Sequence, residues 1–182
     1  LARGLAQAVA GCSPLNELAV AACEHSHQQY CWPMVSGRAA MTFVLQAMHK
    51  LRPDRDTVII PGYTCYSVPA AVERAGLKVQ LCDISPDTLG VDVNQLRRFD
   101  LKRVLSVVSA NLYGLPNDLT AIEEFARNGG IYMLDDAAQA LGALVDDRPV
   151  GGFGDAGIYS FDKGKKITSI QGGVIVVRAG PL

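Results

Sequence analysis

Two short apolar segments, each ending in chemically active side chains, constrain the fold of this chain more than any other feature. Residues 131–134 are apolar, partly β-branched and partly aromatic, which is typical of a buried strand, and Asp135 and Asp136 follow them directly. Residues 156–161 predict a second strand, which carries Ser160 near its end. Because ligands bind at the carboxyl ends of strands in open α/β sheets, these segments predict a site with both carboxylates and amines. The amines belong to three lysines, at positions 163, 165 and 166.

The remainder of the chain alternates short apolar strands with amphipathic helices. This rhythm is typical of βαβ units, which build a mainly parallel sheet covered by helices. The sequence has no internal repeat or long flexible linker, so one α/β domain is the simplest organisation. We expect further strands at residues 57–60, 78–84, 103–108 and 174–177, and helices at residues 38–50, 67–76, 93–99 and 119–128.

The charge balance argues against polyanionic partners. The chain has 17 basic and 18 acidic residues, so we expect no long-range attraction to nucleic acid or to an anionic membrane. The longest uncharged stretch near the start, residues 5–16, is too short to span a bilayer and lacks the layout of a signal peptide. We therefore expect a cytoplasmic protein.

The cysteines and histidines do not form a metal-binding pattern. The five cysteines are odd in number and scattered, which indicates a reducing compartment rather than a disulfide framework or a zinc site. His25 and His27 form a His-x-His, but no further ligand lies at metal-binding spacing. We expect packed or solvated histidines and no metal site.

The segment that follows Ser36 and Gly37 indicates an anion site. Residues 38–50 are good helix formers, so a helix that begins here presents unpaired backbone N–H groups, at Gly37, Arg38 and Ala39, together with its positive dipole end. On these residues alone, an ordinary capped helix is the simpler interpretation.

The carboxylates, the lysines and this helix start together favour pyridoxal phosphate. A lysine amine bonds to the aldehyde of that cofactor, and a carboxylate keeps its ring nitrogen protonated, so that the ring accepts electrons from the substrate. Taken separately, Asp135 and Asp136 fit turn or cap carboxylates, and the lysines fit a solvated loop. The joint arrangement favours the cofactor.

In order and spacing of its motifs, the chain from about residue 35 to about residue 178 resembles the DegT/DnrJ/EryC1/StrS family of fold-type-I sugar aminotransferases. Each motif is common by itself, but six in the family's order are specific. They are Ser36-Gly-Arg-Ala-Ala40, Ile60-Pro-Gly-Tyr-Thr64, Leu112-Tyr-Gly114, Asp136-Ala-Ala-Gln139, Gly151-Gly-Phe-Gly-Asp155 and Ser160-Phe with Lys165 and Gly172-Gly173.

The resemblance implies a fold and a division of the chain. The fold is the large domain of a PLP-dependent transferase similar to aspartate aminotransferase: a three-layer α/β/α arrangement around a mainly parallel sheet. We expect a lead-in helix and linker over residues 1–35 and the PLP-binding large domain, truncated, over residues 36–182. Family members continue into a smaller C-terminal domain, which this chain lacks, and we therefore expect the isolated chain to be poorly active.

The resemblance also assigns catalytic roles. Lys165 lies five residues after Ser160 and seven before Gly172, as the bonding lysine of the family does, whereas local physics does not choose among the three lysines. Neighbours on a strand point to opposite faces, so only one aspartate can reach the ring nitrogen, and we predict Asp136. Gln139 is expected to contact the ring hydroxyl or to cover one face of the ring.

Other cofactor contacts are implied with alternatives. We expect the backbone N–H groups of the segment that begins at Ser36, namely those of Gly37, Arg38 and Ala39, to hold the phosphate with the Ser160 hydroxyl. The ring-stacking position of the family aligns with Cys65, and the nearest aromatic side chain is Tyr66, so either can cover the ring. Asn111 stands where relatives often have histidine; it either hydrogen-bonds the cofactor or substrate or caps a loop.

The function implied is a PLP-dependent aminotransfer from an amino acid, such as glutamate, to a keto-sugar nucleotide, by a homodimer with no nucleic-acid or membrane partner. A second hypothesis is another PLP-dependent reaction on a sugar, by a dehydratase or lyase. Related dehydratases replace the bonding lysine with histidine, so Lys165 argues against it. A third hypothesis is a non-catalytic protein that retains the PLP fold.

Overall fold

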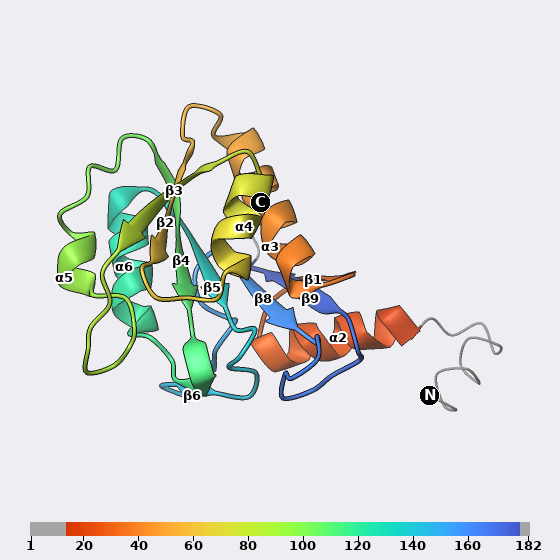
Figure 1. The fold of residues 1–182 in the computed structure, drawn as a ribbon. Coiled ribbons are helices and arrows are strands. Elements are labelled where there is room, and N and C mark those ends of the chain that lie inside the picture. Colours follow the sequence, from red (N-terminus) through yellow and green to blue (C-terminus); the bar gives the residue numbers. More distant parts are fainter. Residues whose placement is uncertain (1–13, 179–182) are drawn as a thin grey trace.

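The structure, a computed structural model, describes residues 14–178, which form one α/β domain (Figure 1). Parts of both expected divisions, residues 1–13 of 1–35 and residues 179–182 of 36–182, lie outside the described residues. The helices are α2 (Pro14–Ser26), α3 (Gly37–Leu51), α4 (Ser67–Arg74), α5 (Val93–Leu96) and α6 (Leu119–Gly129), with a short 3-10 turn, η1 (Leu112–Gly114). The strands are β1 (Tyr30–Met34), β2 (Thr57–Pro61), β3 (Lys78–Cys82), β4 (Val104–Ala110), β5 (Tyr132–Asp136), β6 (Leu144–Val145), β7 (Arg148–Pro149), β8 (Ala156–Ser160) and β9 (Gly173–Val177).

The main sheet has seven strands in the order β1-β9-β8-β5-β4-β2-β3. Strands β3, β2, β4, β5 and β8 run parallel to one another, whereas β9 is antiparallel to both β8 and β1. The expected mainly parallel sheet is confirmed. Because parallel strands end at a common edge, the carboxyl ends of β2, β4, β5 and β8 lie together, which is where a ligand site is expected.

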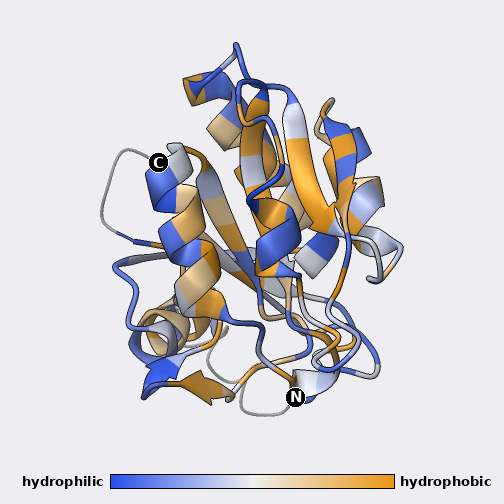
Figure 2. Cartoon of the chain, turned by 90° about the vertical axis from the view of Figure 1, so that its left-hand side faces the viewer, coloured by the Kyte–Doolittle hydropathy of each residue, from blue (hydrophilic) through white to orange (hydrophobic). Residues whose placement is uncertain are grey.

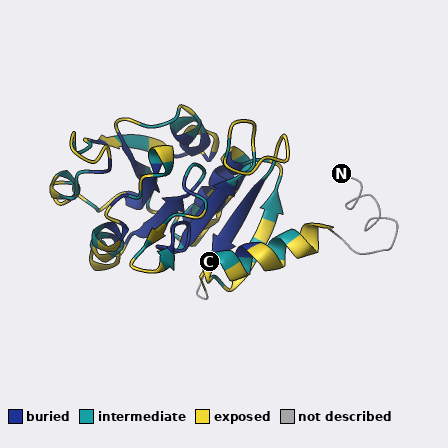
Figure 3. Cartoon of the chain, turned by 90° about the horizontal axis from the view of Figure 1, so that it is seen from below, coloured by how far each residue is buried: buried dark blue, intermediate teal, exposed yellow. Residues whose placement is uncertain are grey.

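Helices cover both faces of the sheet and give three layers. Along each central strand, alternate side chains enter opposite cores: Val108 and Leu134 pack with α3 and α4, whereas Val107 and Met133 pack with α5 and α6. The strands are apolar between helices whose outer surfaces are polar (Figure 2). Seen from below, the central strands are buried and the exposed residues gather on the helices and loops (Figure 3). The expected α/β/α architecture is confirmed.

The structure corrects one expectation, because β1 lies in the segment that was expected to be a helix and a linker. Residues Tyr30–Met34 pair antiparallel with β9 along its whole length, so they form an edge strand of the sheet. All five residues of β9 are buried, and β1 satisfies the backbone groups on its open side. Pro33 is tolerated because an edge strand needs fewer N–H donors. The first strand of the sheet therefore precedes residue 36, although the division at that residue stays a prediction.

No helix between residues 14 and 178 has the length and apolar character needed to cross a bilayer.

Candidate active site

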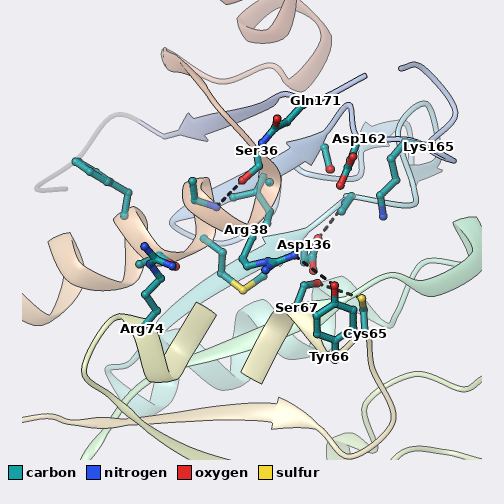
Figure 4. Close-up of a pocket in the computed structure, with 18 of the residues that line it drawn as sticks. Ser36, Arg38, Cys65, Tyr66, Ser67, Arg74, Asp136, Asp162, Lys165 and Gln171 are labelled. Carbon is teal, nitrogen blue, oxygen red and sulfur yellow. Dashed lines mark hydrogen bonds between the residues drawn. The ribbon is translucent and has the colours of Figure 1, made fainter. Parts of the chain in front are cut away.

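The start of α3 and the ends of β5 and β8 meet at a cavity of about 780 Å³ (Figure 4). This volume lies within the range typical of small-molecule sites. Two of the predicted residues, Asn111 and Gln139, line a smaller adjoining cavity, which Asp136, Cys65 and Lys165 also line. The predicted residues on the larger cavity are Ser36, Gly37, Arg38, Ala39, Cys65, Tyr66, Asp136, Ser160 and Lys165.

The helix start and the end of β8 touch so closely that only glycine fits between them. A methyl group added at Gly37 would lie 2.8 Å from Cβ and 3.1 Å from Oγ of Ser160. Carbon atoms that are not bonded to each other do not approach to 2.8 Å without strain, so the absence of a side chain at Gly37 brings the Ser160 hydroxyl beside the helix N-terminus. Sequence spacing alone did not indicate this contact, because 123 residues separate the two positions.

The cap of α3 leaves two backbone donors at the cavity. Ser36 is the N-cap, and its Oγ accepts a hydrogen bond from the Ala39 N–H at 3.1 Å. The Ala39 donor, expected to hold a phosphate, is therefore used within the helix start. Among residues 14–178, the N–H groups of Gly37 and Arg38 and the Ser160 hydroxyl have no hydrogen-bond partner. Helix N-terminal donors beside a hydroxyl form a site that suits a phosphate group.

Asp135 and Asp136 point to opposite sides of β5, as the alternation of strand residues requires. The Asp136 side chain lines both cavities, and its Oδ1 accepts a hydrogen bond from the Ala138 N–H at 3.0 Å. Asp135 is completely buried and lines neither cavity. Burial raises the pKa of Asp136 to about 6, against the effects of the Ala138 N–H and the positive charge of Lys165. Burial also raises the pKa of Asp135 to about 7, although three N–H donors oppose that shift.

The three lysines of the loop after β8 occupy different positions. Lys165 lines both cavities together with Asp136, and both side chains are drawn in the close-up of the larger cavity (Figure 4). Lys163 lines only the larger cavity. Lys166 directs its Nζ toward Gly114 instead, to within 3.5 Å of where a methyl group at that glycine would lie. Of the three lysines, Lys165 is the one that lines both cavities together with Asp136.

Cys65 and Tyr66 lie at different depths. Cys65 lines both cavities, and its Sγ accepts a hydrogen bond from the Ser67 hydroxyl at 3.1 Å. Tyr66 lies at the mouth, where its side chain is 72 % exposed. The guanidinium of Arg38 lies 5.5 Å from the centre of the Tyr66 ring and donates to its hydroxyl at 3.4 Å. Cys65 is therefore the one of the two that also borders the adjoining cavity beside Asp136.

Asn111 and Gln139 are held by other parts of the protein. The Asn111 amide is buried and bonds to Asp135, with Nδ2 2.7 Å from Oδ1, and it accepts a hydrogen bond from the Asn117 N–H at 3.0 Å. Gln139 accepts a hydrogen bond at Oε1 from the N–H of Tyr113 at 3.0 Å. The Asn111 amide is thus occupied within the protein, whereas the Gln139 amide nitrogen remains available to the adjoining cavity.

Several residues that line the cavity were missed from the sequence. Six of them lie on α3 and α4, and the others lie in or beside β5, β8 and β9, so they became apparent only when the orientations of these elements were known. The period of the helix predicts that Phe43 and Gln46 lie on the same face of α3. It does not predict that Arg74 of α4 lines the same cavity. The residues are Met41, Thr42, Phe43, Gln46, Ser67, Arg74, Ala138, Ile158, Asp162 and Gln171.

The raised pKa of Asp136 predicts a pH dependence of stability. The folded state holds this proton more tightly than the unfolded chain, so the contribution of Asp136 to stability is complete below about pH 4 and is lost as the pH rises through about 6. The difference in free energy of unfolding between the cofactor-free protein and Asp136→Asn should fall by up to about 3 kcal/mol over that interval. Urea denaturation of both proteins at a series of pH values measures this difference. A difference that is independent of pH would show that the pKa of Asp136 is not raised in the folded protein.

Within residues 14–178, no group of three or more His, Cys, Asp or Glu side chains is placed to hold a metal ion.

Comparison with known proteins gives a consistent result. The sequence profile of the DegT/DnrJ/EryC1/StrS aminotransferase family matches residues 9–182. The chain is 33 % identical over 147 residues to the L-glutamine:2-deoxy-scyllo-inosose aminotransferase of Streptomyces kanamyceticus, a match that covers 81 % of this chain and 34 % of that protein. It is 31 % identical over 121 residues to the GDP-perosamine synthase of Vibrio cholerae, which covers 66 % of this chain and 33 % of that protein.

The fold is also similar to solved structures. The crystal structure of 3-amino-5-hydroxybenzoic acid synthase superimposes with a TM-score of 0.89 at 25 % identity and covers 98 % of this chain and 47 % of the other. The chain thus spans about a third of the length of these two curated relatives, 34 % and 33 %, and about half of the solved chain.

Proposed function

The chain belongs to the DegT/DnrJ/EryC1/StrS aminotransferase family, and on that premise we propose that its protein transfers an amino group from an amino acid to a keto-sugar nucleotide. Family membership indicates pyridoxal 5′-phosphate as the cofactor. The single observation that carries the proposal is the shared cavity of Asp136, Lys165, Ser160 and the free N-terminus of α3. These groups match the ring nitrogen, the aldehyde and the phosphate of that cofactor.

The residues fit the cofactor at each of its polar ends. The N–H groups of Gly37 and Arg38 and the hydroxyl of Ser160 would hold the phosphate, since none has a partner among the described residues. Asp136 would face the ring nitrogen, and Lys165 would bond to the aldehyde carbon. When bound, the cofactor supplies a ring that accepts the electrons of a substrate carbanion.

The remaining steps belong to the side chains of the chain itself. Asp136 would hold a proton on the ring nitrogen, which a carboxylate does best where little water competes, and Asp136 is only 8 % exposed. The amine of Lys165, which lines both cavities with Asp136, would move a proton at the α-carbon of the substrate. Cys65 borders the space beside Asp136 and would cover one face of the ring, and the Gln139 amide nitrogen would reach the ring hydroxyl.

The proposal extends to partners and compartment. Val35, two residues before α3, and Phe43, which lies within α3 and lines the cavity, are 72 % and 63 % exposed, and these exposed apolar side chains support a homodimer. The near-neutral charge supports small-molecule substrates rather than nucleic acid or membrane. We place the protein in the cytoplasm on the cysteine pattern of the sequence.

A single-turnover half-reaction tests this function. Full-length protein loaded with pyridoxal phosphate and mixed with glutamate should release one equivalent of 2-oxoglutarate per bound cofactor. Cofactor binding without 2-oxoglutarate would favour a dehydratase or lyase, and the absence of cofactor binding would favour a non-catalytic protein. The absence of cofactor binding refutes the aminotransferase proposal, and so does the absence of a 2-oxo acid product when glutamine and other amino acids replace glutamate.

Replacing Ser160 with alanine should weaken cofactor binding about tenfold without abolishing it. The hydroxyl is one donor to a charged group, and such a hydrogen bond is worth about 1.5 kcal/mol, which is about a factor of ten in affinity. Titration of the cofactor-free protein with pyridoxal phosphate measures the change. Ser85→Ala is the matched control, because Ser85 lines neither cavity. An unchanged affinity in Ser160→Ala would exclude Ser160 from the phosphate site.

A further inference from the structure

Asp135 is a buried carboxylate that the proposed reaction does not use. Its Oδ2 accepts hydrogen bonds from the N–H groups of Gly151, at 2.6 Å, and Phe153, at 3.2 Å. Its Oδ1 accepts a hydrogen bond from Asn111 Nδ2 at 2.7 Å. Among residues 14–178, no cation is paired with it. A buried group with this many donors and no counter-ion is costly to keep, so a role is expected for it.

The bonds of Asp135 lead directly to the backbone of Asp136. Asn111, which Asp135 holds, donates to the Asp136 carbonyl oxygen twice, from its backbone N–H at 3.1 Å and from Nδ2 at 3.0 Å. On the other side of the strand end, the next backbone donor, Ala137 N–H, bonds to the Ile158 carbonyl at 3.0 Å. The peptide that follows Asp136 is therefore fixed from β4 and from β8, and Asp135 anchors the first of these attachments.

We propose that Asp135 is a positioning residue: by holding Asn111 and the Gly151–Phe153 turn with one carboxylate, it fixes the end of β5 so that Asp136 faces the cofactor ring nitrogen. This inference rests on the proposed function and adds a residue to it. Asn111 was expected either to hydrogen-bond the cofactor or substrate or to cap a loop. The proposal gives its amide a different role, since it acts here through Asp135 and the strand end.

The chemistry of the Asp135→Asn substitution shows why the carboxylate is needed. An asparagine amide has one acceptor oxygen and one donor nitrogen. If the amide oxygen faces the Gly151 and Phe153 N–H groups, the amide nitrogen faces the nitrogen of the Asn111 side chain, and two donors meet. In the reverse orientation, the amide nitrogen faces the Gly151 and Phe153 N–H groups, and donors meet there instead. One attachment must be released in either orientation, and a carboxylate alone accepts on both sides.

The experiment follows the protonation of the cofactor ring in the full-length protein loaded with pyridoxal phosphate that carries ¹⁵N in the ring. In Asp135→Asn, the nitrogen resonance should move toward that of the unprotonated ring, because Asp136 is displaced. The kcat should fall about 10- to 100-fold, as expected for misplacement of a catalytic group by about 1 Å, while KM changes less than about threefold.

Glu123→Gln is the matched structural control. Glu123 Oε1 accepts a hydrogen bond from the Gly154 N–H at 2.9 Å, and Glu123 pairs with Arg148 at 2.9 Å, so it holds the same turn from its other side. This variant should lose stability in urea denaturation but keep the nitrogen resonance of the unchanged protein. An equal movement of the resonance in Glu123→Gln would show that Asp135 acts only on the turn, and would overturn the proposal.

Asn111→Ala provides a second variant if Asp135→Asn does not fold. It removes the amide that links Asp135 to the Asp136 carbonyl, and it should move the nitrogen resonance in the same direction. Because both changes break the same link from Asp135 to the Asp136 carbonyl, the kcat of the double variant should be no lower than that of the more severe single variant. Additive effects on kcat would refute the shared role.

The outcomes separate this inference from the proposed function. If the unchanged protein gives no resonance of bound cofactor, the proposed function fails. If the unchanged protein gives a protonated-ring resonance and Asp135→Asn gives the same one, the function stands and the positioning role of Asp135 is refuted.

Discussion

Replacing Lys165 with alanine is expected to abolish covalent attachment of pyridoxal phosphate and to lower the rate of amino transfer by at least about 10³-fold, since covalent catalysis loses its nucleophile. Lys165 is the lysine of its loop that lines both cavities with Asp136, and the Lys166 amine points toward Gly114 instead. Borohydride reduction followed by intact-mass measurement detects the attached cofactor, and the rate of 2-oxoglutarate release gives the activity.

Lys163→Ala and Lys166→Ala are the matched controls from the same loop. Each should retain the mass of the attached cofactor and most of the activity. Lys163 gives the more demanding comparison, because it also lines the larger cavity. Normal attachment in Lys165→Ala, with loss in either control, would transfer the role to that other lysine.

Replacing Asp136 with asparagine should leave cofactor binding within about tenfold of normal and lower kcat by about 10²- to 10⁴-fold, the range for loss of an electrostatic or acid–base group. The phosphate contacts proposed at Gly37, Arg38 and Ser160 should be unaffected, so the affinity for the cofactor should survive. An amide cannot hold the ring nitrogen in its protonated form as a carboxylate does, so the electron-accepting ring is lost. Cofactor titration and steady-state kinetics measure the two effects separately.

Asp162→Asn provides the control for this change, since Asp162 is an exposed carboxylate that lines the same cavity. It should reduce kcat less than about threefold, in the manner of surface charges. Near-normal kcat in Asp136→Asn, together with complete loss of activity in Asp135→Asn, would assign the ring nitrogen to Asp135 instead.

The fold and much of the cavity could be predicted from the sequence because they depend on local patterns. The apolar runs before Asp135 and Ser160 predict β5 and β8, and the strand period predicts that neighbouring aspartates face opposite ways. The start of α3 follows from Ser36 and Gly37. These features require only neighbours in the chain. The preference for Lys165 came from family spacing, and the positions of the three lysines in the structure support it.

Other features could not be predicted because they depend on contacts between distant residues. Strand β1 is short and contains Pro33, and its pairing depends on β9, which lies about 140 residues later in the chain. The burial of Asp135 depends on the turn at Gly151, which the sequence shows only as a glycine-rich motif.

The use of the Ala39 N–H by the Ser36 cap is local, and cap preferences do predict it. The phosphate interpretation had assigned the same donor to the cofactor.

Transfer of nitrogen tests the central claim most directly. Full-length protein, pyridoxal phosphate and ¹⁵N-glutamate are incubated with GDP-, UDP- and TDP-linked keto-sugars and with a free keto-cyclitol, and the products are analysed by mass spectrometry. The aminotransferase account predicts one sugar-nucleotide product that carries ¹⁵N, formed by the unchanged protein but not by Lys165→Ala. A dehydrated product without ¹⁵N, or equal labelling by Lys165→Ala, would contradict it.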